Sequence, residues 1–303
     1  MSLFPGFGGR PQPHPVSLAT VYAVPDFNGQ DLNVSGTGSV IRTKHGPVLV
    51  TAGHVLTGRH PNGDCRHSQA ALPNRITLTK YFGKLASDIP LYAGDNDPNS
   101  DTPRYFRHTR PAVDLAVLPL PSGAGHHVAN TLHDSVWRPS AYPGSEIPLE
   151  VATPCYIIGY PEGLTNHVGR VGLLLLWKTG NIANGPQFPF SNPKLGLQDD
   201  QVCLVDATGR PGMSGGPVFL IQTRLTEEWK AISAVTQLAI ETAHAARVRP
   251  SAISGSPLTQ AVGRRHRLVG FYTGRTSETS DIGLVWKLPL LHQILSDAFG
   301  TEW

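Results

Sequence analysis

Short runs of hydrophobic residues recur along most of the chain, and segments rich in glycine and proline separate them. Residues 16–24 alternate hydrophobic and polar positions, and residues 36–56 have the pattern of a hairpin that turns at Lys44–Pro47. Residues 113–120 are almost continuously hydrophobic, as in a strand buried on both faces. A second group of such runs begins after a loop rich in proline and histidine. The pattern favours many short strands over a helical bundle.

Two groups of strands followed by a helix predict an all-β fold made of two six-stranded antiparallel β-barrels. Residues 1–15 are an N-terminal extension, residues 16–135 form the first barrel lobe, and residues 136–303 form the second. Hydrophobic residues at helical spacing over about 288–299 predict a C-terminal amphipathic helix. The length of 303 residues suits two small lobes packed together.

Residues 223–248 depart from the strand pattern, because Leu225, Trp229 and Ile232 fall roughly on one face of a helix. A segment rich in serine, proline and glycine follows. We therefore expect a partly helical insertion at about 223–264, between two strands of the second lobe. The insertion could control access to a site, or it could pack on the outside of the barrel without a role. The sequence leaves both interpretations open.

Composition and charge narrow the class of partner. Hydrophobic residues make up 40% and charged residues 16%, which is typical of a globular protein. The net charge is only +3, and the densest basic cluster, residues 263–267, is better explained as a solvated loop than as a nucleic-acid site. No run approaches the roughly 18 hydrophobic residues of a membrane span, and the N-terminus lacks the pattern of a signal peptide. We expect neither nucleic acid nor a membrane as partner.

Cysteine content bears on the compartment. The chain has three cysteines, Cys65, Cys155 and Cys203, which cannot all pair with one another. Three are also few for a secreted scaffold held by disulfides. A protein of the reducing cytoplasm is the simplest interpretation.

A metal site is the weaker interpretation of the histidine-rich segments. His60, Cys65 and His67 lie close together in the sequence and are potential ligands. Their spacing does not match a zinc motif, and neither HExxH nor a pair of CxxC motifs is present. We expect these residues, and also His126 and His127, to lie in exposed loops. No metal or other cofactor is predicted.

The segment GRPGMSGGPVF, residues 209–219, places four glycines around Ser214. Glycines permit the unusual dihedral angles that aim backbone N–H groups at one point beside a nucleophile. A serine nucleophile needs a base, and the base needs an orienting carboxylate. His54 directly follows a hydrophobic run, and Asp114 stands at the head of another, where an unpaired carboxylate would be costly. These three residues are therefore the candidate catalytic group.

Three motifs resemble those of the trypsin-like (chymotrypsin-fold) serine proteases. TAGHV (51–55) is similar to the histidine motif of that family, DLAVL (114–118) to its aspartate motif, and GMSGGPV (212–218) to its serine motif. Two sequence segments, IIGYPEGL (157–164) and VDATGRPGMSGGP (205–217), are most similar to those of the bacterial HtrA/Deg-type peptidases. Matching stretches run from about Val16 to the C-terminal helix. No trailing segment is long enough for the PDZ domain that many HtrA proteins carry.

The resemblance implies a serine endopeptidase that acts on proteins or peptides. His54 would be the general base and later the general acid, and Asp114 would orient its ring and stabilise the imidazolium. Ser214 would form the acyl-enzyme, and the amides of Gly212 and Ser214 would bind the oxyanion. The alternative is a catalytically silent binding module of the same fold, which predicts a broken triad or a lost glycine loop. The sequence shows neither.

Departures from the family pattern concern disulfides and activation. Val55 and Leu220 stand where secreted members have half-cystines, so the bridges of secreted members are missing. Met213 replaces the aspartate that pairs with a newly freed N-terminus when a zymogen is activated. Control by trimming of the N-terminus is therefore not expected. Regulation would come from the insertion or from a protein partner.

Substrate preference is inferred from the pocket that the resemblance implies. Residues 206–210 and 270–274 would line it, with Thr208, Phe271, Tyr272 and Thr273 as the substrate-binding residues. Thr208 stands where members that cleave after arginine or lysine carry an acid, so a cation-binding pocket is not supported. We expect a small or medium hydrophobic P1 residue, with Phe271 or Tyr272 narrowing the pocket.

Overall fold

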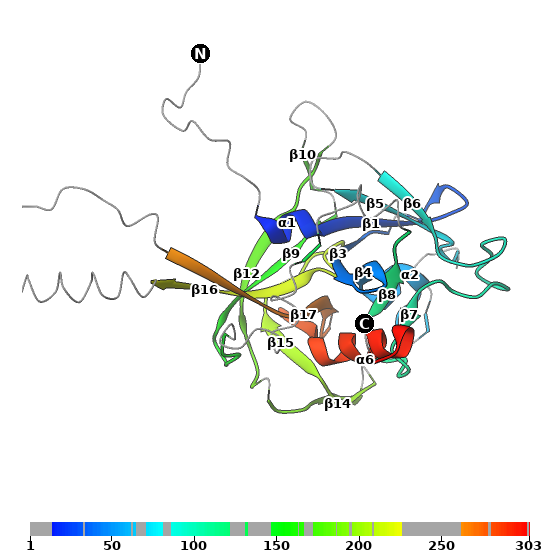
Figure 1. Cartoon of the computed structure of the whole chain (residues 1–303). Helices are drawn as coiled ribbons and strands as arrows, with labels where there is room; N and C mark the ends of the chain where they lie inside the picture. The colour runs from blue at the N-terminus through cyan, green and yellow to red at the C-terminus, as the bar shows by residue number, and fades with distance from the viewer. Residues whose placement is uncertain are drawn as a thin grey trace, which may run out of the picture.

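The predicted all-β architecture with two strand groups and a C-terminal helix is confirmed (Figure 1). The structure is a computed structural model that describes residues 14–32, 34–61, 63–64, 71–80, 86–121, 131–132, 147–162, 164–166, 172–185, 187–193, 196–207, 209–225, 262–277, 280–301 and 303. Within these ranges, no helix has the length and hydrophobicity needed to cross a membrane.

The first lobe is an eight-stranded antiparallel sheet. Its hydrogen-bonded order is β6-β5-β1-β3-β4-β8-β7, with β2 paired to β1, and this path stays open over the described residues. The predicted hairpin is confirmed, because Thr43 pairs with Gly46 across its turn. The strands are β1 (Thr20–Phe27), β2 (Gln30–Asp31), β3 (Gly36–Thr43), β4 (Gly46–Thr51), β5 (Arg75–Lys80), β6 (Ala86–Pro90), β7 (Phe106–Arg107) and β8 (Ala116–Pro119).

One predicted strand begins later than expected. The alternation from residue 16 predicted a strand there, but a short helix, α1 (Pro15–Ala19), comes first and β1 begins at Thr20. Proline fits the first turn of a helix because its φ is already helical and its missing N–H is not needed there. The His14 ring also accepts a hydrogen bond from the Val16 amide at 3.3 Å. Local capping therefore outweighs the strand pattern over these residues.

The second lobe is a closed barrel of six strands in the order β12-β15-β18-β17-β16-β9. Two small hairpins, β10–β11 and β13–β14, accompany it. The barrel strands are β9 (Pro154–Gly159), β12 (Leu176–Ile182), β15 (Val202–Asp206), β16 (Pro217–Leu225), β17 (Val262–Arg275) and β18 (Ile282–Lys287). The hairpin strands are β10 (Thr165–Asn166), β11 (Gly172–Leu173), β13 (Phe190–Asn192) and β14 (Leu197–Asp200).

Strands β16 and β17 extend out from the barrel as an arm (Figure 1). Their backbones stay paired as far as Leu225 and Val262. Both ends of the insertion predicted at about 223–264 are therefore strand. Its remaining residues, 226–261, lie outside the described residues.

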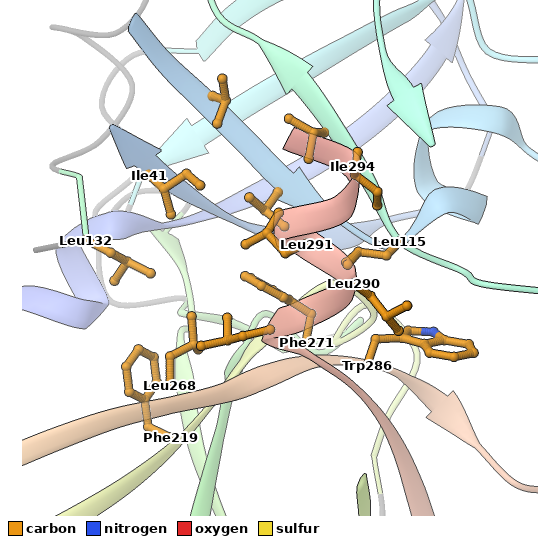
Figure 2. Close-up of a cluster of buried hydrophobic side chains, with 14 of the residues drawn as sticks. Ile41, Leu115, Leu132, Phe219, Leu268, Phe271, Trp286, Leu290, Leu291 and Ile294 are labelled. Atoms are coloured by element: carbon orange, nitrogen blue, oxygen red, sulfur yellow. The ribbon is translucent and has the colours of Figure 1, made fainter. Parts of the chain in front are cut away.

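The two lobes share one hydrophobic core, and the helix α6 (Leu288–Phe299) packs within it. Figure 2 shows side chains of this helix among residues of both lobes. Leu291 and Ile294 are fully buried there, with Ile41 from β3 and Phe271 from β17 in the same cluster. Each lobe also has a core of its own. The helix therefore contributes to the packing of one lobe on the other, next to the interface where the candidate residues lie.

Candidate active site

His54 lies in a short buried helix directly after a strand of the first lobe. Strand β4 ends at Thr51, and helix α2 (Gly53–Thr57) begins two residues later. The helix is only five residues long and ends at Gly58, whose φ of 65° is in the left-handed region that favours glycine. Only 5% of the His54 surface is exposed. The tight turn thus brings the imidazole to the end of the β4 strand and holds it in the interior.

The carboxylate of Asp114 holds His54 at two points. Its Oδ2 lies 2.5 Å from Nδ1 of the His54 ring, and its Oδ1 accepts the backbone amide of His54 at 2.8 Å. An ionised carboxylate only accepts hydrogen bonds, so Nδ1 of the ring donates to it, and in the neutral imidazole Nε2 is then the acceptor nitrogen. Nε2 is buried and has no hydrogen-bond partner among the described residues. This orients the ring with a basic nitrogen left available.

Ser214 lies in the turn that precedes β16, and its side chain is half-buried. Its hydroxyl donates to the carbonyl of Thr273 on β17 at 3.2 Å. Within the described part of the chain, no hydrogen bond joins the Ser214 hydroxyl to Nε2 of His54. Ser214 and His54 nevertheless line the same recess. A rotation of the hydroxyl away from Thr273 is therefore needed before it can donate to the histidine.

The turn around Ser214 leaves alternate amides unpaired. Gly212 and Gly215 have φ values of 85° and 86°, in the left-handed region that favours glycine. The amides of Gly212 and Ser214 have no partner among the residues that the structure describes. The other three amides of the turn donate to backbone carbonyls: Met213 to Arg210, Gly215 to Tyr272 and Gly216 to Met213.

A hydrogen bond from Glu162 fixes the peptide group between Pro211 and Gly212. The carbonyl of Pro211 accepts the amide of Glu162 at 2.8 Å. In a trans peptide the N–H points opposite to the C=O, so the amide of Gly212 points away from Glu162. A Cβ on Gly212 would overlap the carbonyl oxygen of Tyr160, which leaves room only for glycine. Two free amides beside a serine hydroxyl form a group of donors that can bind a negative oxygen.

A recess of about 690 Å³ lies between the lobes and contains His54, Asp114, Ser214 and Thr273. Its remaining lining is largely hydrophobic, and it comes from both lobes. These further residues are His60, Pro61, Pro111, Ala112, Gly196, Leu197, Gly274, Arg275, Leu284 and Trp286. The recess is therefore polar around the candidate catalytic group and hydrophobic next to it.

The predicted substrate-binding residues lie in different places. Thr273 lines the recess, whereas Phe271 is fully buried in the core between the lobes. Tyr272 is buried in the core of the second lobe. Thr208 lies outside the described residues.

The ring of Tyr272 fills a slot between two glycines. A Cβ on Gly209 would overlap the phenol group of Tyr272, and a Cβ on Gly283 would lie 2.6 Å from its Cε2 atom. Burial raises the pKa of Tyr272 to about 12, so the phenol is neutral at ordinary pH. The space between residues 209 and 283 is therefore occupied by an uncharged ring of the protein itself.

The potential metal ligands are only partly described. His60 lines the recess, and its ring centroid lies 6.0 Å from that of His54. Cys65, His67, His126 and His127 lie outside the described residues. Over the described ranges, no three histidine, cysteine or acidic side chains gather closely enough to hold a metal ion.

Comparison with known sequences identifies one domain. The family model of the trypsin-like peptidase domain matches residues 36–226, a range that includes His54, Asp114 and Ser214. No curated protein sequence matches the chain.

Several solved structures are similar in outline. The protease Rv3671c from M. tuberculosis, in its inactive form, is 16% identical, with 95% of this chain and 90% of that chain covered and a TM-score of 0.45. The protease Anisep from Arthrobacter nicotinovorans is 12% identical over 94% and 97% of the two chains, with a TM-score of 0.48. The thermostable serine protease AL20 from an extremophilic microorganism is 12% identical over 93% and 97%, with a TM-score of 0.46.

Proposed function

The chain belongs to the trypsin-like peptidase family and is a serine protease, and we propose that it cleaves peptide bonds through His54, Asp114 and Ser214. The observation that carries the proposal is the pair of contacts from Asp114 to His54, at 2.5 Å and 2.8 Å. They orient the imidazole and leave Nε2 without a partner among the described residues. The third residue, Ser214, lines the same recess.

In the first half of the reaction, Ser214 attacks the carbonyl carbon of the substrate. Its hydroxyl proton passes to Nε2 of His54 as the new C–O bond forms, and the electron pair of the C=O bond moves to the carbonyl oxygen. The unpaired amides of Gly212 and Ser214 stabilise that oxyanion. Asp114 stabilises the imidazolium. The C–N bond then breaks, and Nε2 gives the proton to the leaving amine.

The second half releases the acyl group from Ser214. Water enters, His54 takes one of its protons, and the oxygen attacks the ester carbonyl. The same two amides bind the second oxyanion, and the proton returns to Ser214 as the ester bond breaks. All proton transfers use residues of the chain, and the proposed reaction needs no cofactor.

The substrate backbone is expected to lie along β17 beside Ser214. On the side of β17 that faces β16, backbone pairing among the described residues ends at Tyr272, which exchanges hydrogen bonds with Gly215 and Gly216. Thr273 and Gly274 therefore present a strand edge to the recess. An extended peptide can add to such an edge through main-chain hydrogen bonds. Extended segments of proteins or peptides are thus the proposed substrate class.

We propose a small or medium hydrophobic P1 residue. Gly209 and Tyr272 belong to the segments implied for the P1 pocket, and the Tyr272 ring fills the space between Gly209 and Gly283, which leaves little room for a large side chain. Its phenol is neutral at ordinary pH, so it offers no charge to an arginine or lysine. Leu197 and Trp286 line the same recess as Asp114, and this hydrophobic lining is suited to other hydrophobic side chains of the substrate.

Regulation by the insertion is proposed from its place in the chain. It connects β16, which follows Ser214, to β17, which leads to Thr273. Because Leu225 and Val262 are register partners, a two-residue turn such as Asn-Gly can replace residues 226–261. If the insertion regulates the site, the protein in which this turn replaces residues 226–261 has a peptidase activity different from that of wild type. Unchanged activity in a folded shortened protein contradicts it.

We also propose that the protein works in the cytoplasm. Cys155 and Cys203 are both buried and free, as expected in a reducing compartment. Fractionation of cells that express the tagged protein tests this, and recovery outside the cytoplasm contradicts it.

The test of the mechanism is the mass of the intact protein after incubation with a fluorophosphonate. We expect one adduct on the wild-type protein and none on Ser214→Ala or His54→Ala, with loss of peptidase activity in both variants. An adduct on Ser214→Ala would mean that another residue reacts. No adduct on folded wild-type protein means that the site is latent or that the protein is the silent binding module, and no adduct on the folded shortened protein as well contradicts the mechanism.

A further inference from the structure

Thr37 belongs to the first lobe, yet it contacts the turn that carries Ser214 in the second. It lies on β3 and is fully buried. Its backbone amide donates to the carbonyl of Ser214 at 2.8 Å, and its hydroxyl donates to the carbonyl of Gly212 at 2.8 Å. Its own carbonyl accepts the hydroxyl of Thr51 at 2.7 Å. Two of these hydrogen bonds therefore tie the nucleophile turn to the other lobe.

The Thr37 hydroxyl also reaches the segment on the far side of the turn. It accepts the backbone amide of Tyr160 at 2.9 Å. Two residues later, the amide of Glu162 donates to the carbonyl of Pro211. One hydroxyl therefore holds the carbonyl of Gly212 directly, and it anchors the segment that holds the carbonyl of Pro211.

These two carbonyls set the orientation of the two peptide groups on either side of Gly212. A peptide group is planar, so fixing its oxygen also fixes its N–H. The Pro211 carbonyl directs the amide of Gly212, and the Gly212 carbonyl directs that of Met213, which donates to Arg210. Gly212 can rotate more freely than other residues because it lacks a side chain. Without the Thr37 hydroxyl, the peptide group between Gly212 and Met213 keeps only the hydrogen bond from the Met213 amide to the carbonyl of Arg210.

We propose that Thr37 is a positioning residue for the oxyanion hole. From the opposite lobe, its hydroxyl holds the Gly212 carbonyl and the segment that fixes the Gly212 amide, and its backbone amide holds the Ser214 carbonyl. This assignment rests on the proposed function, in which the amides of Gly212 and Ser214 bind the oxyanion. Thr37 touches neither the substrate nor the reacting atoms, and it acts through Gly212, Tyr160 and Ser214.

The test compares Thr37→Val and Thr37→Ser by steady-state kinetics on one peptide substrate. Valine keeps the shape of threonine and lacks the hydroxyl, whereas serine keeps the hydroxyl. Because oxyanion binding acts on the transition state, we expect Thr37→Val to lower kcat about 10- to 100-fold with KM within about twofold. The second-order rate of fluorophosphonate labelling should fall by a similar factor. Thr37→Ser should restore most of kcat.

Ser39→Ala is the matched control on the same strand. Ser39 is fully buried like Thr37, but its hydroxyl has no hydrogen-bond partner among the described residues. We expect unchanged kcat and KM in this variant. Thermal unfolding of every variant separates loss of fold from loss of positioning. If Thr37→Val does not fold, Thr37→Ala, which also lacks the hydroxyl, takes its place.

Two results would overturn the assignment of Thr37 and leave the proposed function intact. One is a folded Thr37→Val protein with kcat within twofold of wild type. The other is an equal loss of kcat in Thr37→Val and Thr37→Ser, because the hydroxyl would then be irrelevant. An inactive wild-type protein with an intact fold contradicts the proposed function and, with it, this assignment.

Discussion

Asp114 binds both the imidazole and the backbone of His54, through different oxygens of one carboxylate. Oδ2 lies 2.5 Å from Nδ1, and Oδ1 accepts the amide of His54 at 2.8 Å. The second contact satisfies an N–H in the first turn of helix α2, which has no partner within the helix. The same side chain thus fixes both the ring and the turn that carries it.

Asp114→Asn separates these two roles. Its amide oxygen can still accept the His54 amide, but its NH₂ group cannot accept from Nδ1, so the ring loses its orienting acceptor. We expect kcat to fall about 10³- to 10⁴-fold, as in the general Ser-His-Asp template, with little change in thermal stability.

Asp114→Ala is the comparison for that prediction. It removes the acceptor of the buried His54 amide as well, and we expect a further loss of about 1–3 kcal/mol of unfolding free energy. Denaturant titration of both variants measures this difference. Equal stability of the two variants would show that the contact to the His54 backbone is not stabilising.

Tyr272→Val should enlarge the P1 pocket. Removing the ring from between Gly209 and Gly283 frees the space that it fills, so larger hydrophobic P1 residues become acceptable. Profiling with a peptide library should show preference moving towards leucine and phenylalanine. Tyr272→Phe, which keeps the ring, should keep the wild-type profile. If Tyr272→Val has the same P1 preference as wild type, this ring does not set the size limit.

Gly212→Ala should strongly reduce activity because its Cβ would overlap the carbonyl oxygen of Tyr160 and because φ is 85°. We expect a loss of at least about 10² in kcat, the usual effect of removing one oxyanion donor. Gly29→Ala is the control, since Gly29 has a similar φ of 82° but open space around its Cβ position. It should cost about 1 kcal/mol of stability and leave kcat unchanged. Comparable activity losses in both variants would point to general backbone strain.

Cys155 and Cys203 should resist alkylation in the folded protein. Burial raises the pKa of Cys155 to about 12 and that of Cys203 to about 11. Only the thiolate reacts, so at pH 8 both should react far more slowly than in urea, and their rates should rise steeply towards pH 11. Peptide mapping after iodoacetamide treatment follows each site. Rapid labelling of either cysteine at pH 8 in native protein would contradict the burial that the structure gives it.

The sequence was most informative where chemistry lies in one short segment. His54 follows a hydrophobic run, whereas Asp114 and Ser214 precede one, and glycines stand next to His54 and Ser214, so local pattern was enough to single out all three as candidates. The α6 helix was also predictable, because its hydrophobic spacing agrees with its burial.

Contacts between distant segments were not predictable. Thr37 and Gly212 are 175 positions apart, and a threonine in a strand carries no sign of a distant partner. Phe271 and Tyr272 are adjacent in the sequence, but their side chains pack in different cores. To predict which core each side chain enters, one must know how β17 pairs with β18 and where that pairing is irregular, near Gly274. The start of β1 depended on the capping at His14, which competes with an alternating pattern that is otherwise typical of a strand.

Because α6 follows the candidate catalytic residues in the chain, it is synthesised after them. His54, Asp114 and Ser214 all leave the ribosome before the helix that helps to fill the core between the lobes. A nascent chain therefore carries every reacting group while its two halves still lack this shared packing. The shared packing between the two halves is therefore completed only after α6 has been made.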